Sequence, residues 1–226
     1  MQRVRMQKAN HMTPYLQQTT PSGLPNRRTA AVALVLAPAI WTGVRAQPAT
    51  LLRPTPRQTE GPFYPVALPR DADFDLLTNG AMSYTRGQPC WLEGTVTDLA
   101  GKPLAGAQVE IWQCDHEGHY DHPGDGSRID KAFQGFGRVT VNAQGQYRFR
   151  TIKPVAYAGR TPHIHVKVKL GRNELLTTQM YVEGEAANTR DFLWRSLEGQ
   201  ARSALTVPFK AGADGLQASF PLVVQA

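Results

Sequence analysis

Short runs of alternating hydrophobic and polar residues recur along the middle of the chain, and turn-forming residues separate them. Such alternation is typical of β-strands that bury one face and expose the other. Turn signals include Gly101-Lys102-Pro103 and Asn142-Ala143-Gln144-Gly145. The pattern predicts strands over residues 92–97, 107–112, 137–141, 147–152, 163–170 and 175–182, with strand character returning over 216–225.

Strands at this spacing predict an all-β domain, an antiparallel β-sandwich with long functional loops. One segment, residues 189–203, has a helical pattern instead, carried by Phe192, Leu193, Trp194 and Leu197. We therefore expect one short helical segment near the C-terminus. Residues 47–226 have a length suited to a single domain with one core.

Charge is distributed unevenly. Residues 1–46 contain six basic residues and no acidic one, whereas the remainder has 19 Lys and Arg against 18 Asp and Glu. The high isoelectric point of the chain therefore comes from residues 1–46, which we call the leader. Composition gives no support for a basic face on the domain, and we expect no nucleic-acid partner.

The leader has the pattern of an export signal. Arg27-Arg28 precedes an apolar run, residues 30–41, which is too short to span a bilayer and fits a signal sequence. Val44-Arg45-Ala46 is an acceptable cleavage site, so the mature chain should begin near Gln47. The paired arginines favour twin-arginine export. The general secretory route and an uncleaved anchor are the alternatives. We expect a periplasmic or secreted protein with no membrane contact after cleavage.

Cys90 and Cys114 are the only cysteines in the chain. In an exported protein an even pair favours a disulfide over a metal or catalytic pair. Two buried free thiols are the alternative.

His163 and His165 form the most specific local pattern. Pro162 biases the preceding residue toward an extended backbone, and Ile164 begins the apolar face of a strand. Residues two apart on a strand point to the same side, about 7 Å apart at Cα, so both histidines can share one ion. The alternative is two half-exposed strand histidines. Lys167 and Lys169 continue this face, which we expect to run out into solvent.

A second group of possible ligands follows the predicted strand that ends at Trp112. His116-Glu117-Gly118-His119 is one residue short of a zinc-protease motif and lacks helical character, so that interpretation fails. A zinc site could form from His116, His119 and His122. The remaining possibility places Tyr120 at a metal, with the histidines as loop residues.

Over residues 59–182 the sequence resembles the intradiol ring-cleavage dioxygenases, most nearly the protocatechuate 3,4-dioxygenase type. The matching segments occur in order along the chain: Thr59-Glu60-Gly61-Pro62-Phe63, Leu92-Glu93-Gly94, Gly101-Lys102-Pro103-Leu104, Val109-Glu110-Ile111-Trp112-Gln113, Tyr120, residues 147–154, Tyr157, Pro162-His163-Ile164-His165 and Thr178-Gln179-Met180-Tyr181.

The resemblance implies a metal centre with one Fe(III) per chain. Its ligands would be Tyr120, Tyr157, His163 and His165. Phenolate is a hard anionic donor and favours Fe(III) over Fe(II). In the family, a catechol-type diol reacts with O2 and its ring opens between the two hydroxylated carbons to a muconate-type diacid.

The resemblance also implies individual roles. Tyr157 matches the tyrosine that the substrate displaces and that accepts a substrate proton, and Tyr120 matches the tyrosine that stays bound. Arg160 would lie against the substrate ring and stabilise negative charge. Gln179 matches a glutamine near the bound substrate. Members of the family commonly form homo-oligomers.

Two other functions use the same residues. The sandwich could be a catalytically inactive prealbumin-like binding module. A zinc or Fe(II) site could instead form from His163, His165 and a carboxylate such as Asp121.

Overall fold

A computed structural model describes residues 51–226 of the chain. The expected export signal, residues 1–46, and its cleavage site lie outside the described residues. The principal strands are β3 (Pro89–Thr97), β4 (Gln108–Trp112), β5 (Phe136–Thr140), β6 (Gln146–Ile152), β7 (His163–Leu170) and β8 (Asn173–Val182). Shorter strands are β1 (Thr78–Asn79), β2 (Met82–Ser83), β9 (Thr206–Val207), β10 (Lys210–Gly212), β11 (Gly215–Ser219) and β12 (Leu222–Val223). Each of the six predicted central strands is present, with ends shifted by three residues at most.

The strands form two main sheets and a small β1–β2 hairpin. One sheet has the order β10-β11-β3-β12 with β6 paired to β3, and the other has the order β5-β4-β7-β8-β9. Pairing is antiparallel along the central strands, whereas β11 and β12 run parallel to β3 and β9 runs parallel to β8. The all-β sandwich prediction is confirmed, and the parallel pairs come from the C-terminal strands, which return along existing sheet edges.

The two sheets bury one continuous apolar core. Leu92 and Phe149 contribute from the first sheet, and Ile111, Ile164 and Val166 from the second, all fully buried. Burial of each large aliphatic or aromatic side chain stabilises the fold by about 1.5–3 kcal/mol. Because successive residues of a strand point to opposite faces, the apolar residues of β7 fix its histidines on the other face of the sheet.

The expected helical segment is split into two short helices, α1 (Phe192–Ser196) and α2 (Gly199–Leu205). The chain is extended at Leu197 and Glu198 between them, and Leu197 turns toward the core. Short 3-10 turns, η1 (Pro123–Asp125) and η2 (Ala186–Arg190), complete the helical structure of the described residues. None of the helices within residues 51–226 has the length and apolar character to cross a bilayer.

Cys90 and Cys114 are both buried free thiols, so they form no disulfide in this structure. Burial raises the pKa of each thiol to about 12. A protonated, buried thiol is a poor nucleophile and behaves as a small apolar side chain.

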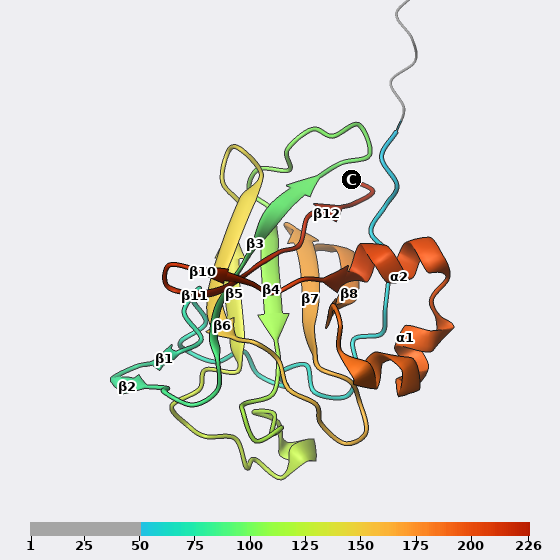
Figure 1. Cartoon of the computed structure of the whole chain (residues 1–226). Coiled ribbons are helices and arrows are strands. Elements are labelled where there is room, and N and C mark those ends of the chain that lie inside the picture. Colours follow the sequence, from blue (N-terminus) through green and yellow to red (C-terminus); the bar gives the residue numbers. More distant parts are fainter. Residues whose placement is uncertain (1–50) are drawn as a thin grey trace, which may run out of the picture. The chain divides into compact units, whose positions relative to one another are not determined.

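The N-terminal segment crosses the outer face of the second sheet, and we call residues 54–65 the N-terminal strap (Figure 1). The Gln58 backbone N–H donates to the Thr177 carbonyl at 2.9 Å, and the Thr178 hydroxyl donates to the Pro56 carbonyl at 2.7 Å. The expectation that the histidine face of β7 runs out into solvent was therefore wrong. Lys167 is only 4% exposed, because the strap covers it.

Candidate metal centre

Three segments bring four possible ligands together at one end of the sheets. His163 and His165 lie on β7, Tyr120 on the loop after β4, and Tyr157 on the loop between β6 and β7. Figure 1 shows both loops and the start of β7 at the same end of the sandwich. Ring centroids are 4.9 Å apart for Tyr120 and Tyr157, 5.5 Å for Tyr157 and His163, and 4.8 Å for the two histidines.

The two histidines direct their Nε2 atoms toward each other, 3.2 Å apart. Nδ1 of His163 donates to the Thr161 carbonyl at 2.6 Å, which leaves the Nε2 lone pair of that ring free. Two imidazole nitrogens each about 2.1 Å from one ion, and at roughly a right angle, lie about 3 Å apart. The observed spacing is thus suited to two ligands of a single metal ion.

Both imidazoles are held in the form that binds metals. Burial, together with the nearby positive charge of Arg160, lowers the pKa of His163 to about 4. Burial, with the neighbouring His163 and Arg160, lowers the pKa of His165 well below its ordinary value. At neutral pH both rings are uncharged, as metal coordination requires.

The two tyrosines differ in their exposure. Tyr120 is 2% exposed, and its hydroxyl makes no hydrogen bond within residues 51–226, a costly arrangement for a buried polar atom. Burial raises the pKa of the Tyr120 phenol well above its usual range, so the residue ionises in this setting only if a cation compensates the charge. Tyr157 is half-buried. Two phenols and two neutral imidazoles are a donor set that fits Fe(III).

A tight turn presents Tyr157 and Arg160 on the same side. The Arg160 N–H donates to the Tyr157 carbonyl at 2.7 Å, and Ala158 and Gly159 between them have φ of 42° and 78°. Two positive φ values at the centre of a turn define the primed type, and alanine adopts them at a cost of about 1 kcal/mol or more. The turn borders a surface cleft of about 410 Å³, lined by residues 156–160, Ala187 and Arg190.

Arg160 and Gln179, both predicted from the sequence, contact each other. Arg160 Nη2 donates to Gln179 Oε1 at 2.8 Å, and Gln179 Nε2 donates to the Thr59 carbonyl at 2.9 Å. Arg160 Nε donates to Asp191 Oδ2 at 2.7 Å. Asp191 was not predicted from the sequence. Its position directly before Phe192, where α1 begins, is a capping signal, but the contact with Arg160 depends on tertiary structure.

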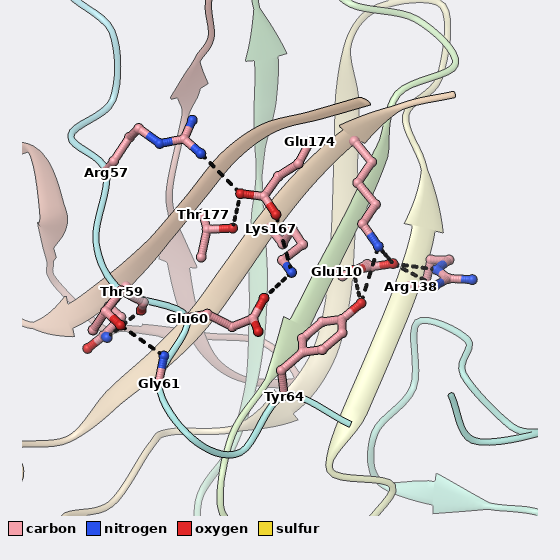
Figure 2. A network of polar contacts seen from close by, with 12 residues as sticks. Arg57, Thr59, Glu60, Gly61, Tyr64, Glu110, Arg138, Lys167, Glu174 and Thr177 are labelled. Carbon is pink, nitrogen blue, oxygen red and sulfur yellow. Dashed lines mark hydrogen bonds and ion pairs between the residues drawn. The ribbon is translucent and has the colours of Figure 1, made fainter. Parts of the chain in front are cut away.

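Charged residues fix the strap over the sheet (Figure 2). Lys167 forms ion pairs with Glu60 of the strap and, at 3.4 Å, with Glu174, which also binds Arg57 at 3.0 Å. Lys167 Nζ lies 3.9 Å from the centroid of the Tyr64 ring, a cation–π contact. The lysine therefore joins the strap to the strand that carries both histidines.

A second set of contacts surrounds Glu110, which is fully buried. Its carboxylate accepts hydrogen bonds from Tyr64 at 2.8 Å and from Arg138 at 2.9 and 2.6 Å (Figure 2). Lys169 Nζ donates to the same carboxylate at 3.2 Å. A buried carboxylate is stable only with such partners. The hydrogen bond from Tyr64 anchors the end of the strap nearest the metal centre.

The anchored strap closes one side of the centre. Phe63 stacks on Tyr120 with ring centroids 4.8 Å apart. Gly61 lies against His165: a Cβ on Gly61 would be 3.1 Å from His165 Cε1, and its φ is +74°. Glycine suits this position because it permits both the close approach and the positive φ.

The histidines of the 116–122 loop do not form a metal site. His122 Nδ1 accepts the Gly124 N–H at 2.9 Å, and His119 Nδ1 lies 3.7 Å from Asp125. Within residues 51–226, no three His, Cys, Asp or Glu side chains converge as metal ligands would. The same finding removes the geometric support for a zinc or Fe(II) site built from His163, His165 and Asp121.

Known proteins are similar to this chain in sequence and in fold. The family model described as "Dioxygenase" matches residues 59–226. The chain is 33% identical to a catechol 1,2-dioxygenase of Acinetobacter baylyi over 163 residues, 64% of this chain and 51% of the relative. It is 35% identical to a protocatechuate 3,4-dioxygenase beta chain of Burkholderia cepacia over 149 residues, 61% of this chain and 63% of the relative.

A solved structure of a dioxygenase domain has the same fold. The dioxygenase domain of a dioxygenase–carbohydrate-binding protein fusion from Streptomyces sp. SirexAA-E superposes with a TM-score of 0.62 at 35% identity, covering 77% of this chain and 99% of that chain. The chain belongs to the intradiol ring-cleavage dioxygenase family. It spans about half the length of several curated relatives it matches.

Proposed function

We propose that this chain is a non-haem Fe(III) intradiol dioxygenase that cleaves a catechol-type diol with O2. The observation that carries the proposal is the convergence of Tyr120, Tyr157, His163 and His165, with the facing histidine nitrogens 3.2 Å apart. The proposed product is a muconate-type diacid, formed by opening the ring between the two hydroxylated carbons. Both atoms of O2 enter that product.

A bound ferric ion would supply the Lewis acidity and the redox chemistry that make a catecholate ring reactive toward O2. Tyr120, Tyr157, His163 and His165 would hold it. Of these, Tyr120 and the two histidines are buried and fixed by their neighbours. Phe63 and the N-terminal strap cover the Tyr120 side, which limits the access of water there.

Tyr157 is the residue suited to change its role during the reaction. Its ring is half-buried and borders the 410 Å³ cleft, through which a diol could approach. The phenolate oxygen of Tyr157 would accept a proton from a substrate hydroxyl, and Tyr157 would then be a neutral phenol. Arg160, joined to Tyr157 by the tight turn, would stabilise negative charge on the ring because a guanidinium keeps its proton.

Oxygen consumption and product analysis test the proposal. Iron-loaded protein mixed with catechol should consume one O2 per diol and yield a diacid whose absorption rises in the ultraviolet. Labelled O2 should place one labelled oxygen in each new carboxyl group. An iron-loaded protein that binds catechol and consumes no O2 would instead support the inactive prealbumin-like binding module.

We also propose export, from the sequence of residues 1–46. The paired arginines, the short apolar run and the cleavage site at Ala46 support it. Mass spectrometry of the protein from its native host should find a chain beginning at Gln47. An intact leader would oppose the proposal. Assembly into a homo-oligomer is a further expectation from the family, which light scattering would test.

A further inference from the structure

The junction between η2 and α1 is connected to the proposed active site by one buried carboxylate, that of Asp191. Asp191 is 1% exposed and lies between the two helical elements. Its Oδ1 accepts the backbone N–H groups of Leu193 at 3.0 Å and Trp194 at 2.9 Å, which caps α1. Its Oδ2 accepts Arg160 Nε at 2.7 Å and the Thr161 N–H at 3.0 Å. A single side chain therefore joins the helix to two residues of the site loop.

The same junction also holds Thr161 from its other side. Asn188, which is buried, accepts the Thr161 hydroxyl at 2.7 Å and donates to the Val182 carbonyl at 2.8 Å. The Thr161 carbonyl in turn accepts the Nδ1–H of His163. The residue between the arginine and the histidine is thus fixed at its backbone and its side chain, independently of any contact with the metal.

The ion pair between Asp191 and Arg160 fixes the plane of the guanidinium. Asp191 holds Nε, and Gln179 holds Nη2 at 2.8 Å. Two acceptors at fixed positions remove most of the freedom of a long, flexible side chain. Although burial acts to raise it, hydrogen bonds from Arg160, Trp194 and Thr161 keep the pKa of Asp191 below its usual range.

We propose that Asp191 is a positioning residue for the ring-cleavage reaction. It acts through Arg160, holding the guanidinium where charge develops on the substrate, and it does not itself touch the substrate. The inference rests on the proposed function. Misplacement of a catalytic group by about 1 Å can cost about 100-fold in rate, so the contact is significant for turnover.

The first test needs neither iron nor turnover. In the ¹H–¹⁵N spectrum of metal-free protein, Arg160 should give an Nε–H signal protected from exchange by its buried partner. R160K identifies that signal by its disappearance. D191N should keep the resonance but abolish its protection. A signal in D191N that stays as protected as in the parent protein would overturn the proposal.

The second test is kinetic and uses iron-loaded protein with catechol. D191N should lower kcat about 100-fold and leave KM and the iron content unchanged. Adding D191N to R160A should cause no further loss, because the carboxylate acts only through the arginine. E185Q is the matched control: Glu185 caps η2 through Ala187, whereas the Arg160 side chain pairs with Asp191 and Gln179, so kcat of E185Q should be unchanged.

Loss of iron and thermal stability in D191N, together with additive loss in the double variant, would mark Asp191 as merely structural and overturn the proposal. Failure of the proposed function has a different signature. In that case the parent protein itself consumes no O2 with catechol, while the protection of the Arg160 signal still reports whether Asp191 holds the guanidinium.

Discussion

The indole of Trp112 lies parallel to the imidazole of His165, with ring centroids 4.8 Å apart and planes 9° apart. The two residues are direct partners in the β4–β7 ladder. Because β4 and β7 are neighbouring strands of one sheet, the stack holds the imidazole against a side chain of the adjacent strand. The proposed metal centre therefore depends on the packing of the sheet as well as on its candidate ligands.

Trp112→Ala should remove that support. We expect it to destabilise the protein by about 3–5 kcal/mol and to weaken iron binding about 10–100-fold, since a ligand without its supporting neighbour loses orientation. Trp91→Ala is the control, because Trp91 lies on β3 of the other sheet, where it stacks on Phe74. It should lower stability and leave iron affinity unchanged. Thermal unfolding and iron titration measure both effects. Equal iron affinity in the two variants would contradict this account of Trp112.

Gly61→Ala should disturb His165 from the side of the strap. The new Cβ would lie 3.1 Å from the imidazole, so either the ring or the strap must shift. Gly184→Ala is matched closely, with φ of +75° and no atom within 4 Å of the added Cβ. In both variants the free energy of unfolding should fall by about 1 kcal/mol, because alanine is strained at a positive φ. Only Gly61→Ala should also weaken iron binding. Identical iron titrations for the two would show that contact with His165 is unimportant.

Tyr157→Phe and His165→Ala should separate turnover from metal binding. Tyr157 is half-buried beside the cleft, so its loss should leave iron bound and slow turnover by about 100-fold. His165 is fully buried between Trp112 and the other ligands, and its removal should abolish iron retention after dialysis. Iron analysis and O2 uptake on the same samples decide the matter. Full activity in either variant would exclude the four-ligand assignment.

The buried thiols should make stability depend on alkaline pH. Burial raises the pKa of Cys90 from 9.0 to about 12, so the folded state keeps a proton that the unfolded chain releases. This contribution is fully present below pH 9 and is lost as the pH rises toward 12. The expected slope is about 1.4 kcal/mol per pH unit for each such thiol. Cys90→Ala should make the fall of the unfolding free energy between pH 9 and 11 shallower. An unchanged slope would contradict this assignment.

The alternation of hydrophobic and polar residues was sufficient to predict the central strands, because each of them buries one face against the other sheet. It failed at Lys167, which has the spacing of a solvent-facing residue. Its burial depends on Glu60 and the strap, more than 100 residues away in sequence, and no local pattern contains that information. The helical pattern likewise did not predict that α1 ends before Leu197. There the backbone is extended and the leucine side chain packs into the core.

The candidate site divides in the same way. The family resemblance implied Tyr120, Tyr157, His163 and His165 as a set, and the structure brings all four together. Asp191 was not predicted, since a capping aspartate before a helix has the same local sequence whether or not it also binds an arginine. Ordered motifs thus predict candidate ligand-binding residues, whereas the residues that hold those side chains in place become apparent only in three dimensions.

The visible absorption spectrum of the iron-loaded protein tests the central claim most directly. Phenolate bound to Fe(III) absorbs strongly in the visible, so protein with one iron per chain should be red-brown, with a broad band. The band should weaken in Tyr120→Phe and in Tyr157→Phe. A colourless protein containing one iron per chain would contradict the assignment of Tyr120 and Tyr157 as ligands and favour a histidine-based Fe(II) site.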